Sequence, residues 1–234
     1  KVTLVEMADR ILQRVACAQT SDYFRALHQS HGVTLLEGVG LSSLTGTDHV
    51  TAAILSNGTT LDIDFALVGV GIQPNTQLAD AAGLTLNNGI ETNALGQTSQ
   101  SKIWAAGDCA SFPYQGERIR LESVPNAIDQ AEVVAANMLG AQKAYHATPW
   151  FWSDQYDVKL QIAGLNQGFE NVVTRIGEAG RSHWYYKAGQ VLAVDAMNDP
   201  RAYMVAKRLI EAGKTADPAL VADPGSDLKA LLRG

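Results

Sequence analysis

The chain has 234 residues, of which 46% are hydrophobic and 18% are charged, a composition typical of a globular protein with a substantial core. Its net charge is −6, and no cluster of lysine and arginine resembles a nucleic-acid-binding surface. No stretch approaches the roughly 18 consecutive apolar residues of a membrane span, so the composition argues against nucleic acid and membrane as partners.

The sequence predicts no metal site. Cys17 and Cys109 are the only cysteines, and neither belongs to a CxxC or a metal-type Cys/His pattern. The five histidines are scattered along the chain, which is typical of surface and packing residues. A reducing, cytoplasmic location is the simplest inference from such cysteines.

The N-terminal part alternates short apolar runs with turn residues. Residues 2–5 predict a buried strand that ends on Glu6. A helix is expected over residues 20–30, closed by Gly32, and a second strand over residues 33–36.

A hairpin is expected next, within residues 50–71, VTAAILSNGTTLDIDFALVGVG. Asn57 and Gly58 lie between two apolar runs, and Asn-Gly in that position is the strongest short hairpin signal. The apolar run at residues 65–70 predicts a further buried strand.

The middle of the chain is rich in turn residues after Pro74. Residues 103–106 predict a short buried strand that stops at Gly107 and Asp108. Apolar residues at helical spacing predict a helix over residues 126–139, followed by a C-cap glycine.

The last third predicts a small antiparallel sheet and a helix. Four stretches are interpreted as one strand each: WFWSDQYDVKLQIAGL, ENVVTRIGE, RSHWYYKAG and QVLAVDAMN. Asp199 and Pro200 then have the pattern of an N-cap and a first helical residue, with the helix running to Ala212 and stopping at Gly213.

Gly107 and Asp108 have two possible interpretations. Glycine and aspartate are ordinary turn residues, so the pair can simply end a strand. A ligand site would use the same two residues, because glycine lets a large group approach the backbone and a carboxylate accepts hydrogen bonds from hydroxyls. These residues alone do not separate the two interpretations.

Glu6 has two possible interpretations as well. An acid at the end of a strand in a dinucleotide-binding βαβ unit binds ribose hydroxyls, about 20 residues after a G-x-G-x-x-G loop. No such loop precedes Glu6, and Gly69-Val70-Gly71 is followed by Pro74, which argues against a helix starting there. Taken alone, Glu6 is an ordinary acid at the end of a strand.

Five stretches occur in order along the chain: VTLVE, VGVGIQPN, TSQSKIWAAGDCA, ESVPNAIDQA and PWFWSDQY. With them the sequence resembles the FAD-dependent, NADH-oxidising ferredoxin reductases of the putidaredoxin and rubredoxin reductase type. The resemblance covers nearly the whole chain.

The resemblance implies an FAD site. In that family the Gly-Asp pair meets the flavin nucleotide, so Gly107 is expected to allow a close approach and Asp108 to accept bonds from its hydroxyls. The stretch with Ser123, Val124 and Asn126 is expected to aim a helix N-terminus at the flavin ring. The positive end of the helix dipole favours the negative charge of the reduced flavin.

The resemblance also implies contacts with NAD and with a protein partner. Glu6 is expected at the adenosine ribose, and Gly71 and Ile72 beside the nicotinamide nucleotide. Trp152 is expected at the flavin edge, where an iron–sulfur protein docks, and Trp150 is assigned there less firmly because it can equally be a core residue. No catalytic residue can be named, because the acid and base expected beside flavin N5 do not occur in this chain.

The expected fold class is α/β, with parts of FAD- and NAD-binding Rossmann-like domains of the glutathione-reductase type and an α+β C-terminal reductase domain. Residues 1–73 would be the second half of the NAD domain, residues 74–147 the second half of the FAD domain, and residues 148–234 the C-terminal domain. The family's first FAD segment and glycine loop are missing here. The chain is therefore expected to be a piece of a longer one, with two sheets left open on one side.

The expected function is electron transfer from NADH through FAD to a [2Fe–2S] ferredoxin or a rubredoxin, typically in the service of an oxygenase. Two alternatives stay open at this point. One is a flavoprotein of the apoptosis-inducing-factor branch that does not transfer electrons, and the other is an inactive fragment that binds no nucleotide tightly.

Overall fold

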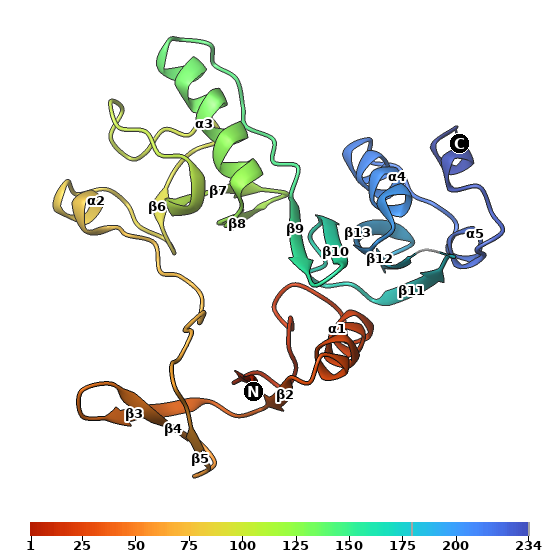
Figure 1. The fold of residues 1–234 in the computed structure, drawn as a ribbon. Coiled ribbons are helices and arrows are strands. Elements are labelled where there is room, and N and C mark those ends of the chain that lie inside the picture. The colour runs from red at the N-terminus through yellow and green to blue at the C-terminus, as the bar shows by residue number, and fades with distance from the viewer. Residues whose placement is uncertain (179, 234) are drawn as a thin grey trace.

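The structure, a computed structural model, describes residues 1–178 and 180–233 (Figure 1). Its N-terminal unit is a βαβ unit, in which β1 (Thr3–Glu6) and β2 (Thr34–Glu37) pair in parallel and α1 (Ala18–Ser30) connects them. The predicted strand, helix and strand are confirmed, each shifted by only one or two residues. Glu6 is the last residue of β1 and lies opposite Glu37 in the register.

A three-stranded antiparallel sheet follows, formed by β3 (Leu41–Gly46), β4 (Val50–Leu55) and β5 (Thr60–Asp62). The hairpin predicted at Asn57 and Gly58 joins β4 to β5 and is confirmed. Strand β3 was not predicted, because all its residues are exposed and its side chains show no apolar alternation.

The buried strand predicted at residues 65–70 is wrong. Phe65 and Val70 are 71% and 90% exposed, and the segment is an extended connection between β5 and α2 (Gln77–Ala81) (Figure 1). An apolar run becomes a strand only where a neighbouring strand offers hydrogen-bonding groups, and none of the described strands pairs with it.

The middle of the chain is built around the helix α3 (Val124–Met138). Four short elements lie before it in the chain: β6 (Ile90–Glu91), the 3-10 turn η1 (Gly107–Cys109), β7 (Ala110–Tyr114) and β8 (Glu117–Ile119). β6 pairs in parallel with β7, and β7 pairs antiparallel with β8. The strand predicted at residues 103–106 is wrong, since only an isolated bridge between Gln97 and Trp104 forms there.

Helix α3 is confirmed, with an earlier start than predicted. The Ser123 hydroxyl accepts a hydrogen bond from the Asn126 N–H at 3.2 Å, and Pro125 lies in the first turn, so capping moves the start to Val124. Gly140 follows the C-cap at φ +96°, as the sequence predicts.

The buried face of α3 is more polar, and its exposed face more apolar, than its sequence suggests. The buried face is largely polar and consists of Asn126, Gln130, Val134 and Asn137. Two residues of the apolar stripe that predicts the helix, Ile128 and Met138, are 54% and 62% exposed. The polar side chains bind loop backbone, as in the bonds from Asn137 Nδ2 to the carbonyl oxygens of Leu95 and Lys143.

The C-terminal sheet has five antiparallel strands in the order β11-β12-β13-β10-β9. Their bounds are β9 (Trp150–Gln155), β10 (Val158–Gly164), β11 (Asn171–Ile176), β12 (Arg181–Lys187) and β13 (Gln190–Met197). The prediction of a single strand over residues 150–165 is wrong, because the chain reverses at Tyr156 and Asp157. No glycine or proline marks this turn, and Tyr156 adopts φ +56°.

Helix α4 (Pro200–Glu211) covers one face of this sheet, and α5 (Pro218–Ala222) and the 3-10 helix η2 (Leu228–Arg233) follow it. Asp199 caps α4 by accepting a bond from the Ala202 N–H at 2.9 Å, which confirms the predicted N-cap. None of the described helices is long and apolar enough to cross a membrane.

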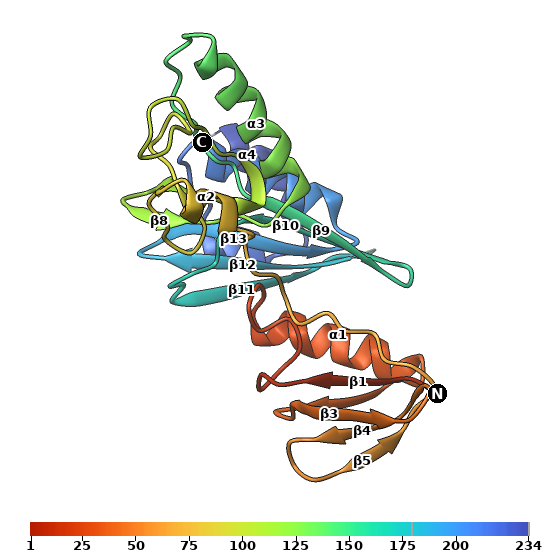
Figure 2. The same ribbon diagram turned by 90° about the vertical axis from the view of Figure 1, so that its left-hand side faces the viewer.

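The N-terminal unit covers the opposite face of the sheet. Phe24 of α1 and the preceding Ile11 pack against Leu160, Ile162 and Met197. The sheet is therefore a middle layer, with α4 on one side and α1 on the other (Figure 2).

A buried polar network joins α1 to this sheet. The Asp195 carboxylate accepts bonds from the Tyr185 hydroxyl and from the Thr20 hydroxyl, the latter at 2.6 Å. Tyr185 in turn accepts a bond at 2.7 Å from the N–H of Cys17, the N-cap residue of α1. An acid of the C-terminal sheet therefore lies at the positive end of an N-terminal helix.

Candidate functional site

The Gly107–Asp108 turn packs against the first turns of α3. Gly107 is buried at φ +76°, and a Cβ there would lie 3.4 Å from the Cβ of Ala127. Asp108 beside it is exposed. The sequence places this glycine and this acid at the end of a strand, but the structure places them in η1, directly before β7.

Gln130 holds this turn in place, and sequence reasoning missed it. Its Oε1 accepts a bond from the Gly107 N–H at 2.8 Å, and its side chain is buried on α3. A buried glutamine on a helix has to find hydrogen-bond partners, but the sequence does not say where they are.

Arg120, between β8 and α3, also contacts the turn. Its Nη1 donates to the Asp108 carbonyl oxygen at 2.7 Å, and its Nη2 donates to Glu122 Oε1 at 2.6 Å. Glu122 further accepts a bond from Arg14 of the N-terminal unit at 3.3 Å. Sequence reasoning missed Arg120 and Glu122 as well.

The start of α3 presents one free donor. The Ser123 hydroxyl and carbonyl oxygens accept from the N–H groups of Asn126 and Ala127, and Pro125 has no N–H. Val124 is the first helical residue and is 62% exposed, so its N–H is left without an intrahelical partner.

Asn126 is occupied inside the protein. Its Nδ2 donates to the Leu121 carbonyl oxygen at 3.2 Å, and its Oδ1 accepts from the Tyr145 hydroxyl at 2.9 Å. The amide has a second hydrogen and its oxygen a second lone pair, but Asn126 is only 5% exposed. The geometry therefore gives this side chain a structural role at the entry to α3.

Trp152 lies on the edge strand β9, which contacts α3. It is 40% exposed, and its ring centroid is 5.4 Å from that of Trp150. Trp150 packs against the core under α4, with its ring centroid 6.4 Å from that of Tyr203. The two tryptophans thus differ: Trp150 belongs to the core and Trp152 to the surface.

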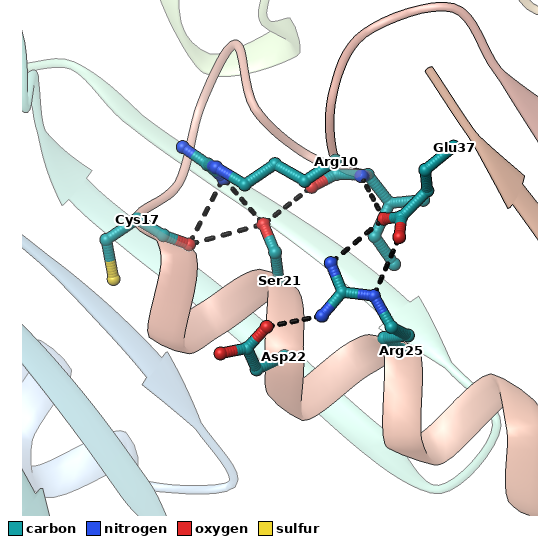
Figure 3. A network of polar contacts seen from close by, with 7 residues as sticks. Arg10, Cys17, Ser21, Asp22, Arg25 and Glu37 are labelled. Carbon is teal, nitrogen blue, oxygen red and sulfur yellow. Dashed lines mark hydrogen bonds and ion pairs between the residues drawn. The ribbon is translucent and has the colours of Figure 1, made fainter. Parts of the chain in front are cut away.

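Glu6 is partly buried, and its Oε1 accepts a bond from the Ala8 N–H at 2.8 Å. Glu37, across the parallel pair, has a different environment (Figure 3). It accepts two bonds from Arg25 and one from the Ile11 N–H, and the guanidinium holds the pKa of Glu37 below its usual range. Glu37 therefore has a structural role.

Arg10 also has a structural role. Its Nη1 donates to the Cys17 carbonyl oxygen at 3.2 Å and to the Ser21 hydroxyl at 2.6 Å (Figure 3). These bonds fasten the loop that follows β1 to the first turn of α1.

Gly71 and Ile72 lie in the exposed connection before α2. Gly71 adopts φ +90°, and Ile72 is 55% exposed. Within residues 1–178 and 180–233, no hydrogen bond or ion pair links these two residues to Glu6 or to the Gly107–Asp108 turn. Direct contacts thus join the Gly107–Asp108 turn to α3, and Trp152 is connected to them only through the contact of its strand with α3.

Comparison with known proteins identifies the family. Residues 1–131 match the family model described as pyridine nucleotide-disulphide oxidoreductase, and residues 150–232 match the one described as reductase C-terminal. The chain belongs to the pyridine nucleotide-disulphide oxidoreductase family. The resemblance and the fold class predicted from the sequence are confirmed.

Individual members of this oxidoreductase family are similar over nearly the whole chain. Putidaredoxin reductase of Pseudomonas putida is 38% identical over 99% of this chain and 56% of its own length. The ferredoxin–NAD(P)(+) reductase of a Sphingomonas species is 40% identical over 97% of this chain and 56% of its own length. The chain thus spans just over half the length of these relatives.

Solved structures of family members have the same fold. The ferredoxin reductase for the CYP199A2 system of Rhodopseudomonas palustris is 40% identical and has a TM-score of 0.94, over 98% of this chain and 58% of that one. Putidaredoxin reductase in a covalent complex with putidaredoxin is 37% identical and also has a TM-score of 0.94, over 99% of this chain and 57% of that one.

Proposed function

We propose that these residues work within an NADH-dependent ferredoxin reductase that serves an oxygenase. When bound, FAD supplies the chemistry: it takes a hydride from NADH and passes single electrons to a [2Fe–2S] ferredoxin or a rubredoxin. One observation carries the proposal, namely the Gly107–Asp108 turn fixed against the N-terminus of α3.

The residues at this turn fit a flavin nucleotide. Gly107 lets the turn adopt φ +76° and pack against Ala127 of α3, the neighbouring carboxylate of Asp108 is exposed, and the free N–H of Val124 lies at the positive end of a helix of 15 residues. Asp108 would bind hydroxyls, and the start of α3 would stabilise negative charge on the reduced ring. Trp152 would lie at the edge of that ring.

The names of the relatives support electron transfer over the two alternatives. Putidaredoxin, rhodocoxin and ferredoxin reductases are 36–40% identical to this chain. The division into residues 1–73, 74–147 and 148–234 remains part of the proposal, as does a cytoplasmic location, which rests on the two free cysteines.

A direct test uses the purified intact protein, because this chain spans only just over half the length of its relatives. We expect a yellow protein whose flavin absorbance bleaches with NADH and returns when oxidised ferredoxin is added. A protein that takes up FAD but is not reduced by NADH would favour the non-electron-transfer branch, and one that takes up no FAD would favour the inactive fragment.

NADH is expected to be preferred over NADPH. Glu6 at the end of β1 would accept from the ribose 2′-OH of NADH and repel a 2′-phosphate. Arg10 and Arg14 lie nearby in the sequence and would soften this preference by attracting a 2′-phosphate, but Arg10 is bound to Cys17 and Ser21, and Arg14 is paired with Glu122. Steady-state kcat/KM for both cofactors measures the preference, and Glu6→Gln should shift it toward NADPH. Equal or better use of NADPH by the unaltered protein would contradict this role of Glu6.

The iron–sulfur partner is proposed to dock on the surface formed by Trp152 and the exposed side of α4. Arg201, Met204 and Arg208 recur at helical spacing on that side and are exposed. Lys207 lies outside this row and is paired with Glu211. An acidic partner would therefore meet the two arginines, although the chain as a whole carries a charge of −6.

Charge reversal distinguishes these cations. Arg208→Glu is expected to slow ferredoxin reduction severalfold and to flatten its salt dependence, because charges at the rim of an interface act mainly on the association rate. Lys207→Glu, the matched control one residue away, should have a smaller effect because its charge is already neutralised by Glu211. Reduction of ferricyanide should survive in both variants. Unchanged ferredoxin kinetics after reversing Arg201 and Arg208 together would refute this docking surface.

A further inference from the structure

Arg120 is a buried cation between the two segments of the candidate flavin site. Its side chain is 8% exposed, and its two terminal nitrogens bind the Asp108 carbonyl oxygen and the Glu122 carboxylate. Glu122 immediately precedes Ser123, the N-cap of α3. One guanidinium therefore spans from the turn to the helix start.

Stability alone does not account for this arginine. Taking a guanidinium out of water is costly, and replacing a buried ion pair by apolar side chains is often neutral or stabilising. The Nε of Arg120 is also buried, with no hydrogen-bond partner among the described residues. The position of this charge, between the two segments of the candidate site, therefore points to a role beyond stability.

The backbone beside Arg120 is shaped to fit its side chain. Gly89 adopts φ +134°, and a Cβ at that position would lie 3.0 Å from Arg120 Cδ and 2.7 Å from the Cys109 carbonyl oxygen. The aliphatic part of Arg120 passes over this glycine to reach Asp108. A larger residue at position 89 would push the arginine away from the turn.

We propose that Arg120 is a positioning residue for the flavin: it fixes the Asp108 turn and the N-terminus of α3 at one separation and places a positive charge beside them. This inference rests on the proposed FAD site. Gln130 holds the same turn from the other side through the Gly107 N–H. Gln130 is neutral, whereas the two cations Arg14 and Arg120 share the one anion Glu122 and leave a net positive charge. Arg120 is therefore the member of the pair that also acts on the charge of a reduced flavin.

The test compares Arg120→Met with Arg120→Lys in the flavin-loaded protein. Methionine preserves the aliphatic packing over Gly89 but carries no charge. Lysine preserves the charge but lacks the planar guanidinium that binds two acceptors at once. The dissociation constant of FAD, the flavin midpoint potential and Tm are measured for each. Arg120→Met is expected to raise the dissociation constant about tenfold or more and to make the potential more negative. Arg120→Lys should restore the potential but only part of the affinity.

Arg118→Met is the matched control. Arg118 lies two residues earlier on β8 and also binds backbone, at the carbonyl oxygens of Thr92 and Ser111 at 2.9 and 2.6 Å. Its loss should lower Tm and leave the FAD affinity and potential unchanged, because it does not touch the turn.

Three results separate the possibilities. Equal FAD affinity and potential in Arg120→Met and Arg118→Met, with only Tm lowered, would show that Arg120 is merely structural and overturn the inference. Should Arg120→Met fail to fold, wild-type FAD affinity in Arg120→Lys together with an unaltered potential in Glu122→Gln would overturn it too. If the unaltered intact protein binds no FAD, the proposed function itself is wrong.

Discussion

Replacing Asp108 by alanine is expected to weaken FAD binding by about 1.5–3 kcal/mol, or roughly 10–150-fold in the dissociation constant. The exposed carboxylate is the charged acceptor for flavin hydroxyls, and alanine has none. The fold should change little, because the bond that ties this turn to Arg120 uses the backbone carbonyl of residue 108, which alanine keeps.

Extended dialysis followed by FAD titration measures this loss, and thermal unfolding of the flavin-free protein checks the fold. Asp108→Asn is the matched control, because it keeps a neutral acceptor in the same place and should lose less affinity than the alanine variant. If Asp108→Ala keeps stoichiometric flavin through dialysis, Asp108 is an ordinary turn residue.

A second large effect is expected from Tyr185→Phe, in the network that joins α1 to the C-terminal sheet. The Tyr185 hydroxyl donates to Asp195 and accepts from the Cys17 N–H. Phenylalanine fills the same space but leaves both groups without this partner. Since each buried polar group that loses its partner costs about 1–3 kcal/mol, the free energy of unfolding should fall by about 2–4 kcal/mol. Urea denaturation measures it, and a loss below 1 kcal/mol would mean that water replaces the hydroxyl.

The same network predicts a pH dependence of stability. Burial raises the pKa of Asp195 from 3.8 to about 6, while the bonds from Thr20 and Tyr185 act in the opposite direction. The folded state therefore binds a proton more readily than the unfolded state, and this group's contribution to stability falls as the pH rises from about 4 to 6. His183, opposite Asp195 in the sheet, stays neutral through most of this window, because burial lowers its pKa to about 4.

Asp195→Asn isolates this contribution. Asparagine keeps an acceptor for the two hydroxyls but does not titrate, so the difference in unfolding free energy between the two proteins should change with pH only between about 4 and 6. Urea denaturation at several pH values, on both proteins, gives that difference. A difference that is constant over this window would mean that Asp195 is charged in the folded state throughout.

The fold could be predicted from the sequence where each element carries its own signal. The N-terminal βαβ unit has apolar periodicity, the β4–β5 hairpin has Asn57-Gly58, and α4 has the Asp199-Pro200 cap. The wrong strand predictions at residues 65–70 and 103–106 have one cause. An apolar run does not report whether another strand lies beside it to pair with. The turn at Tyr156 and Asp157 was missed because it contains neither glycine nor proline, and one aspartate does not by itself predict a turn.

The candidate site was predictable only in part, for a similar reason. Asp108 and Ser123 lie in short stretches that resemble a known family. Arg120 and Gln130 act through backbone groups 12 and 23 residues away in the sequence, and no local pattern reports such a contact. The pattern of α3 is even misleading. Its buried face is largely polar, and a polar helix face is normally expected to lie in water.

The network between α1 and the sheet also affects how the chain folds during synthesis. Thr20 and its acceptor Asp195 are 175 residues apart. Because synthesis adds roughly 5–20 residues per second, the Asp195 carboxylate is made roughly 10–35 seconds after Thr20. In that time the apolar side of α1, with Phe24, lacks the C-terminal sheet that later covers it, so a nascent chain of this kind is a natural client for chaperones. The N-terminal βαβ unit is thus synthesised long before the sheet that completes its packing.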